Sequence, residues 1–327
     1  MKIKSVLFTG LIVFTLCSCF KKSSDIDIYA DDLYVDCDKL FNNKKTVFSV
    51  GYGSYPQTVV EDSQIISELN KLESSKTADK NGYYTFNDKQ YAPLIAYPAG
   101  NLIQFSNGNY IEFEKKYWFE VETIYWGETD RTRQELDINA QHAELVLYTK
   151  WILDIHIFND DYNGNHNGIY ANDYSHSSLR NWLNNDFYKK AFSKNDKYII
   201  ESNLKCKRAK DIKMEYETGD STYFNNWEEY YLNDKVYIAS DEVGDLKQVG
   251  NDKDCRASGS FRKATLYPTD YALARGMKKI NNEYAEWIRD PSVVKPMNEK
   301  VWRTDYVNNF VVDTTGIGVT PLITVKF

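Results

Sequence analysis

The amino-acid sequence predicts a single α+β domain of antiparallel strands and short helices. Strand-like runs rich in aromatic and β-branched residues recur along most of the 327 residues, and only a few short amphipathic segments interrupt them. There is no internal repeat and no clear linker, which favours one domain over two. Hydrophobic residues make up 42% of the chain, a proportion typical of folded globular proteins. Scattered short helices do not fit the regular strand–helix alternation of a parallel sheet.

The start of the chain is typical of an export signal. Two lysines precede an apolar run at residues 6–16. The run is too short to span a bilayer core, which needs about 20 residues, and has the length of a signal-peptide core. It ends in Leu-Cys-Ser-Cys at residues 16–19, which resembles the lipobox of bacterial lipoproteins. The resemblance implies that a peptidase removes residues 1–18 as a signal peptide and that Cys19 carries the lipid.

Lipidation of Cys19 predicts that the rest of the chain lies outside the cytoplasm. Several acyl chains on one cysteine anchor a protein stably, whereas a single chain binds a membrane only marginally. We therefore expect residues 19–45 to be a lipidated tether on a bacterial cell membrane, and residues 46–327 to be one extracytoplasmic domain. The alternatives are a secretory peptide cleaved elsewhere and an uncleaved N-terminal anchor. The sequence does not distinguish an inner from an outer membrane.

Local signals place the elements of the first half of the domain. Asp62 is a capping residue, and apolar residues follow it at helical spacing. The apolar face of this helix consists of Ile65, Ile66, Leu69 and Leu72. Hairpin turns are expected at residues 87–88 and 107–109. Strands are expected near residues 46–50, 83–86, 102–105, 110–113 and 117–126.

The second half is expected to mix short helices with strands. Residues 177–183 form a capped helical turn, and residues 186–192 continue as a helix after a break. A short helix at residues 269–275 ends at Gly276. Strands are expected at residues 144–158, 235–239, 286–289, 301–306 and 318–325.

Charge excludes one class of partner. The formal net charge of −7 becomes about −9 once Lys2 and Lys4 leave with the signal. Such a chain repels phosphate backbones and anionic head groups, so we expect no nucleic-acid partner. The 26 tyrosines are typical of surfaces that bind sugars or proteins, but an AT-rich genome produces the same composition.

Three cysteines remain besides Cys17 and Cys19. They are Cys37, Cys206 and Cys255, and a disulfide is permitted outside the cytoplasm. Cys206 and Cys255 flank the same charged, irregular region, which makes them the candidate pair. The odd count leaves at least one thiol unpaired or bonded to another chain.

A series of motifs, in order along residues 50–327, resembles an uncharacterised family of bacterial extracellular domains. The motifs are Gly-Ser-Tyr-Pro-Gln at 53–57, Tyr-Trp-Phe-Glu at 117–120, Ser-Ser-Leu-Arg-Asn-Trp-Leu-Asn at 177–184, Phe-Tyr at 187–188, Ala-Phe-Ser at 191–193, Asp-Lys-Val-Tyr-Ile-Ala-Ser at 234–240, Thr-Asp-Tyr-Ala at 269–272, Trp-Ile-Arg-Asp-Pro at 287–291 and Gly-Val-Thr-Pro-Leu at 318–322. Extra sequence lies near residues 127–142 and 207–232.

The end of this pattern also resembles a known fold. A Trp-x-Arg strand followed by a final glycine-led strand is similar to the end of C-type-lectin-like and formylglycine-generating folds. The resemblance implies a C-type-lectin-like domain of twisted antiparallel strands. The chain departs from the family at Thr320, where an arginine is usual, so a site that uses this arginine is altered here.

All four histidines fall within residues 142–176, together with many Asp and Asn residues. Their spacings of 14, 10 and 10 match no zinc motif. Residues 161–165 begin like a calcium loop, but His166 stands where an EF-hand needs Gly and Asn172 where it needs Glu. We therefore expect a polar turn without a metal or other cofactor. The loops around 154–176 are the predicted binding face, represented by His156, Asp160, Asp161, Asn163 and His166.

No nucleophile elbow, phosphate loop or His-Glu-x-x-His motif occurs. Trp182, Trp287 and Trp302 lie inside apolar runs and are expected in the core. We therefore expect a lipid-anchored, non-enzymatic module that binds glycan, cell-wall or protein ligands. The alternatives are an extracytoplasmic hydrolase or oxidase whose residues converge only in the fold, and a purely structural envelope protein. A deep pocket with several His, Asp or Glu favours an enzyme, and a shallow aromatic surface favours binding.

Overall fold

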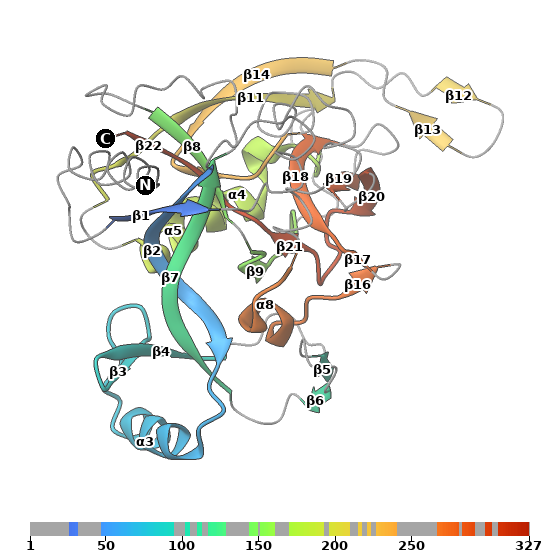
Figure 1. Ribbon diagram of the computed structural model, residues 1–327. Coiled ribbons are helices and arrows are strands. Elements are labelled where there is room, and N and C mark those ends of the chain that lie inside the picture. Colours follow the sequence, from blue (N-terminus) through green and yellow to red (C-terminus); the bar gives the residue numbers. More distant parts are fainter. Residues whose placement is uncertain are drawn as a thin grey trace, which may run out of the picture.

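The computed structural model describes residues 26–31, 47–94, 102–104, 110–112, 117–128, 144–149, 151–160, 170–192, 196–209, 215–217, 221–223, 227–240, 267–280, 283–291, 298–302 and 307–326. These residues are mostly strands, with a few short helices beside a curled antiparallel sheet (Figure 1). The predicted α+β class is therefore confirmed. No helix within the described ranges is long and apolar enough to cross a membrane.

The large sheet joins strands from both halves of the chain. Its main path is β1 (Ile26–Asp31), β2 (Val47–Val59), β7 (Trp118–Glu128), β8 (Glu144–Thr149), β22 (Leu322–Lys326) and β10 (Ile199–Ile200). In addition, β15 (Val236–Tyr237) pairs with β22, and the hairpin of β3 (Tyr84–Phe86) and β4 (Lys89–Pro93) pairs with β7 through β4. Within the segment expected to be a tether, Ile26–Asp31 pairs with β2 as strand β1.

A second sheet packs against the first. Its order is β20 (Val307–Val311), β19 (Asn298–Trp302), β18 (Glu286–Pro291), β21 (Gly318–Val319) and β9 (Asp154–Ile155). The β18–β21 pair is parallel, with Glu286 opposite Gly318, and the other pairs are antiparallel. The main core includes Trp126, Tyr148, Phe158, Phe187 and Trp287, each at most 1% exposed.

The helical segment after Ser177 is continuous. Ser177 caps α4 (Ser178–Trp182), a π-helical turn η3 (Leu183–Phe187) follows, and α5 (Tyr188–Ala191) completes the segment. The predicted break before residue 186 is therefore wrong, because the π turn carries the chain through without interruption. The 3-10 turn η2 (Tyr174–His176) precedes the segment, and Asp173 caps it.

Two predicted long strands are each divided. The 144–158 run separates into β8 and β9, and the 318–325 run separates into β21 and β22 at Thr320 and Pro321. Proline cannot donate to a strand ladder, which explains the second break. The two halves of each run then belong to different sheets.

A small unit with its own core is inserted between β2 and β7. It contains α3 (Ser63–Ser74) and the β3–β4 hairpin, and its core is Val60, Leu69, Tyr84, Tyr91 and Trp118. The Asp62 cap is confirmed, since its carboxylate accepts from the backbone N–H groups of Gln64 and Ile65. The turn at Asn87 and Asp88 is also confirmed, and both residues have positive φ.

The remaining described elements are short, apart from one ribbon. That ribbon pairs β11 (Ser202–Ala209) with β14 (Trp227–Asp234), and β12 (Glu215–Glu217) pairs with β13 (Ser221–Tyr223) beyond its end (Figure 1). The expected hairpin of β5 (Leu102–Gln104) and β6 (Tyr110–Glu112) is confirmed. Thr269 caps α8 (Asp270–Ala274), and β16 (Lys279–Ile280) pairs with β17 (Glu283–Tyr284).

Candidate functional site

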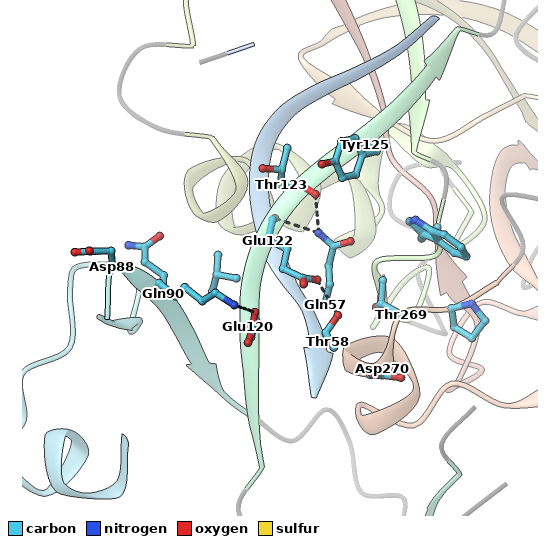
Figure 2. Close-up of a pocket in the computed structure, with 14 residues that line it drawn as sticks. Gln57, Thr58, Asp88, Gln90, Glu120, Glu122, Thr123, Tyr125, Thr269 and Asp270 are labelled. Atoms are coloured by element: carbon cyan, nitrogen blue, oxygen red, sulfur yellow. Dashed lines mark hydrogen bonds and ion pairs between the residues drawn. The ribbon is translucent and has the colours of Figure 1, made fainter. Parts of the chain in front are cut away.

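An open groove of about 740 Å³ lies across β2 and β7. Figure 2 shows Asp88 and Gln90 of the β3–β4 hairpin on one side of β7, and Thr269 and Asp270 at the start of α8 on the other. With β2, β7 and Trp151, the described lining therefore comes from five separate parts of the chain. Most of the side chains that line it are polar or charged.

Gln57 shapes the floor of the groove. The β2–β7 register shifts between Pro56 and Thr58, so Gln57 is the extra residue of a β-bulge. Its side-chain amide donates to the backbone oxygens of Glu122 and Thr123, at 3.1 and 3.0 Å. Gln57, which ends the Gly-Ser-Tyr-Pro-Gln motif, thus holds the two strands together at the bulge.

Three carboxylates in the lining are each oriented by a neighbour. Thr58 Oγ1 donates to Glu122 Oε2 at 2.8 Å, and Lys89 Nζ lies 2.9 Å from Glu120 Oε2. The backbone N–H of Val59 donates to Asp270 Oδ2 at 3.2 Å. The hydrogen bond from Lys89 to Glu120, and the attraction between their charges, raise the pKa of Lys89. With Asp88, the lining carries four carboxylates and one lysine.

Exposed aromatic side chains line another part of the groove. Trp151 is 40% exposed and Tyr125 is 37% exposed, and both line the groove. Tyr267 is 59% exposed, and its ring centroid lies 6.5 Å from that of Trp151. Among the described residues, only one other large hydrophobic side chain, Tyr231, is comparably exposed. Exposed aromatic residues are therefore concentrated at this groove.

Backbone hydrogen bonds fix the aromatic wall. The N–H of Ile152 donates to Tyr267 O, and the N–H of Thr269 donates to Ile152 O, both at 3.0 Å. These bonds form a parallel bridge between Ile152 and Pro268. Trp151 and Tyr267 are therefore placed side by side by regular backbone pairing.

A buried ion pair joins the strands beneath the groove to α8. Arg275 Nε donates to Asp154 Oδ1 at 2.6 Å, and the hydroxyl of Tyr55 donates to Asp154 Oδ2 at 2.6 Å. Asp154 is 1% exposed and Arg275 is 8% exposed. Burial, and secondarily the charge of Asp154, raise the pKa of Tyr55. Because Tyr55 precedes the Gln57 bulge and Arg275 follows α8, this pair holds two parts of the groove lining in position.

The two described residues of the predicted binding face, His156 and Asp160, lie outside the groove. His156 is half-buried, with its ring 5.0 Å from the Trp182 ring and Nδ1 2.7 Å from Ile157 O. Burial is the largest influence on its pKa, which is lowered. Asp160 is exposed, and its backbone N–H bonds to Ser178 Oγ at 3.1 Å. Neither residue lines the groove.

Other predicted residues lie outside the described residues. They are Asp161, Asn163, His166, Cys19 and Cys255, so the 154–176 binding face stays a prediction. No group of three or more His, Cys, Asp or Glu suited to a metal ion occurs in the part of the chain that the structure describes. Trp287 lies in the main core, as expected, and the partly buried Trp182 packs against that core. The side chain of Trp302 lies outside the described part.

Cys206 is a buried thiol on β11. Burial raises its pKa to about 12, so the thiol is protonated at neutral pH and is a poor nucleophile. Because Cys255 is not described, the Cys206–Cys255 disulfide stays a prediction.

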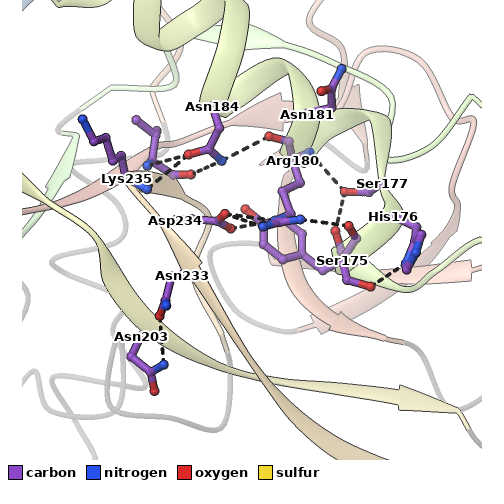
Figure 3. Close-up of polar contacts among 12 residues, drawn as sticks. Ser175, His176, Ser177, Arg180, Asn181, Asn184, Asn203, Asn233, Asp234 and Lys235 are labelled. Carbon is purple, nitrogen blue, oxygen red and sulfur yellow. Dashed lines mark hydrogen bonds and ion pairs between the residues drawn. The ribbon is translucent and has the colours of Figure 1, made fainter.

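The motif residues near α4 form a structural network rather than a pocket. Arg180 donates from Nε and Nη2 to the Asp234 carboxylate at 2.7–3.0 Å, and from Nη1 to Ser175 O at 3.0 Å (Figure 3). Asn184 donates to Val236 O and accepts from the N–H groups of Lys235 and Val236. These contacts fasten the helical segment to the end of β14 and to β15.

Thr320, where the resemblance predicts an arginine, is also buried. Its hydroxyl donates to Glu286 Oε2, and Tyr148 OH bonds the same carboxylate at 2.7 and 2.8 Å. This position, between β21 and β22, is therefore linked to β18 through a buried hydrogen bond.

Comparison with known proteins gives one match. The model of a family described as a domain of unknown function, DUF6273, matches residues 146–327. No curated protein and no solved structure shows significant similarity to the chain. The match covers Trp151 and residues 268–270 of the groove, whereas the Gln57 bulge and β7 precede it. The match agrees with the resemblance to an uncharacterised domain, but the motifs at residues 53–57 and 117–120 lie outside the matched range. Because the match spans more than half of the chain, the chain belongs to the DUF6273 family.

Proposed function

We propose that this chain is a lipid-anchored extracytoplasmic module that binds a saccharide in the groove across β2 and β7. The observation that carries the proposal is the combination of exposed rings at Trp151 and Tyr125 with oriented carboxylates in one open groove. A sugar ring has an apolar face that packs on an aromatic ring and hydroxyls that bond to carboxylate oxygens. Both kinds of contact are available in this groove.

The groove supports binding more than catalysis. Glu120, Glu122 and Asp270 each have a protein partner that orients the carboxylate, and the groove is open to solvent. A general acid needs a pKa raised toward the working pH, which burial usually supplies. Open, partnered carboxylates are better suited to accepting hydrogen bonds from a ligand. The rival hydrolase would be revealed by shorter sugar products after incubation.

We also infer that the domain is a distant C-type-lectin-like fold. Support comes from β18, which contains the Trp287-x-Arg289 sequence and lies beside the glycine-led strand β21. Arg289 is 1% exposed and donates to Ile238 O at 2.7 Å, so the arginine of this pattern has a structural role. Fold similarity supplies no ligand, and the saccharide proposal depends on the groove alone.

Replacing Trp151 by alanine is expected to weaken saccharide binding at least tenfold, because the ring supplies the stacking surface. Tenfold corresponds to about 1.4 kcal/mol, which lies within the range measured for aromatic contacts at interfaces. The full chain in detergent would be titrated calorimetrically with cell-wall oligosaccharides.

The matched control is Tyr231→Ala, since Tyr231 is 62% exposed on β14 and does not line the groove. This variant should bind as the unchanged chain does. Absence of binding by the unchanged chain across the oligosaccharide panel contradicts the proposal, as does an equal loss in both variants.

Replacing Cys19 by serine is expected to abolish acylation, because the lipobox resemblance makes this thiol the attachment site. Cells would be grown with an alkyne-tagged fatty acid, and label on the chain would be detected after purification. Cys37→Ser serves as control and should keep the label. Label that persists in the Cys19 variant, or is missing from the unchanged chain, refutes the anchor.

A further inference from the structure

We infer that the groove prefers saccharides with free, protonated amino groups over their N-acetylated or neutral counterparts. This inference rests on the proposed function, because it names the ligand class of the same groove. Two features of the lining support it: the carboxylates favour a cation over a neutral group, and the exposed indole of Trp151 can hold the sugar so that its amino group reaches them.

The carboxylates leave acceptor oxygens unused. Glu120, Glu122 and Asp270 each employ one oxygen in the contacts that orient them. Within the described ranges, Glu120 Oε1, Glu122 Oε1 and Asp270 Oδ1 accept no hydrogen bond. An ionised carboxylate has about four lone-pair sites, so considerable capacity remains for a ligand.

Each of these three carboxylate residues pairs with or bonds to Thr58 or Val59 of β2. Thr58 lies opposite Glu120 in the β2–β7 register and bonds to Glu122, and the next residue, Val59, bonds to Asp270. An ammonium group carries three N–H donors and no acceptor. A group of three carboxylates at Thr58 and Val59 is therefore better matched to an ammonium than to a hydroxyl or an acetamide.

The net charge of the groove lining also favours an ammonium group. Among the described residues of the lining, Lys89 is the only cationic side chain, and it is already paired with Glu120. Four carboxylates against one lysine leave this described part of the groove net negative. The negative electrostatic potential of the groove attracts a protonated amino sugar, whereas it does not attract a neutral sugar.

The aromatic wall is the second feature. Trp151 offers an exposed indole, and indole is the aromatic ring that attracts cations most strongly. A pyranose stacked on this ring would keep its apolar face on the indole. Its amino group would then be free to reach the carboxylates on the neighbouring strands. N-acetylation removes the charge and with it the attraction to the carboxylates, whereas the pyranose can still stack on the indole.

The test compares two oligosaccharides that differ only in acetylation. The full chain in detergent would be titrated with a glucosamine pentasaccharide and with the matching N-acetylglucosamine pentasaccharide. At low salt we expect the free amine to bind at least tenfold more tightly. At about 1 M salt the difference should shrink, because the Debye length falls to about 3 Å.

Two variants test whether the carboxylates of the groove cause the preference for the free amine. Glu122→Gln and Asp270→Asn each remove one charge with little change in shape, and either should reduce the preference for the free amine about threefold or more. Glu229→Gln is the control, because Glu229 forms an exposed ion pair with Lys205 on the β11–β14 ribbon and does not line the groove. It should leave the preference unchanged.

The outcomes separate the two proposals. Equal affinity for both pentasaccharides overturns the amine preference and leaves saccharide binding intact. Binding of neither sugar, nor of any other saccharide tried, overturns both. A preference that survives in Glu122→Gln and Asp270→Asn also overturns the inference, because the amine is then recognised outside this groove.

Discussion

Replacing Arg275 by methionine is expected to lower the free energy of unfolding by about 3–5 kcal/mol, the usual cost of leaving a buried charge without its partner. Asp154 is 1% exposed, and after the substitution its remaining donors among the described residues are the neutral Tyr55 OH and the N–H of Ile155. Methionine retains much of the volume of the arginine stem, so the loss would come mainly from the charge. Urea unfolding followed by tryptophan fluorescence measures the change.

Lys71→Met is the matched control. Lys71 Nζ lies 2.6 Å from Glu68 Oε1, the same distance as in the Arg275–Asp154 pair, but both side chains are exposed. Exposed pairs on a helix contribute about 0.3–0.5 kcal/mol, so this variant should be nearly as stable as the unchanged chain. Similar losses in the two variants would show that burial does not govern the strength of these pairs.

Replacing Gly53 by alanine is expected to destabilise the protein by about 1–2 kcal/mol for the left-handed backbone and by about 1–3 kcal/mol more for overpacking. Gly53 has φ of +74°, and a Cβ there would lie 2.6 Å from Ala191 O and 2.8 Å from the Phe192 ring. The Ala191 contact is backbone, so relief requires that the end of α5 move away from β2. Thermal and urea unfolding would both report the loss.

Gly82→Ala isolates the contribution of the close contact. Gly82 has nearly the same φ, +80°, but a Cβ there meets nothing within 4 Å. This variant should lose only the backbone contribution of about 1–2 kcal/mol. If both glycine variants lose the same stability, the end of α5 yields easily and the contact with Gly53 is unimportant.

These expectations give the Gly-Ser-Tyr-Pro-Gln motif a physical meaning. Gly53 permits the contact with α5, Tyr55 bonds to Asp154, and Gln57 caps the bulge. Arg180 and Asn184 of the later motif likewise bond to the strands beside them. These residues of the two motifs therefore maintain the fold, whereas Glu120 and Asp270, from two other motifs, line the groove.

The sequence predicts local structure well where the chemistry is local. Asp62, Ser177 and Thr269 each cap a helix because a short polar side chain can reach the first free N–H groups without help from the rest of the fold. The prediction of the Asn87–Asp88 turn is confirmed for a similar reason, since both residues tolerate positive φ. The π turn at Leu183 was missed because helical periodicity alone does not reveal an inserted residue.

The groove could not be predicted in this way. Its lining comes from β2, the β3–β4 turn, β7, Trp151 and the start of α8, which only the sheet topology brings together. Trp151 directly precedes two buried residues, Ile152 and Leu153, so its position in the sequence gives no sign of exposure. His156, one of the residues predicted from the polar stretch at 154–176, is half-buried against Trp182 and does not line the groove.

The position of β22 has a consequence for folding kinetics. β22 lies between β8 and β10, and Leu322 pairs with Tyr148, which is 174 residues earlier. The middle of the large sheet therefore cannot close until two very distant segments meet, and such high contact order is typical of folding in milliseconds to seconds. The inserted unit of α3, β3 and β4 depends on near neighbours and can form much sooner. The wall of the groove that carries Asp88 and Gln90 is then in place before Trp151 and α8 are brought opposite to it.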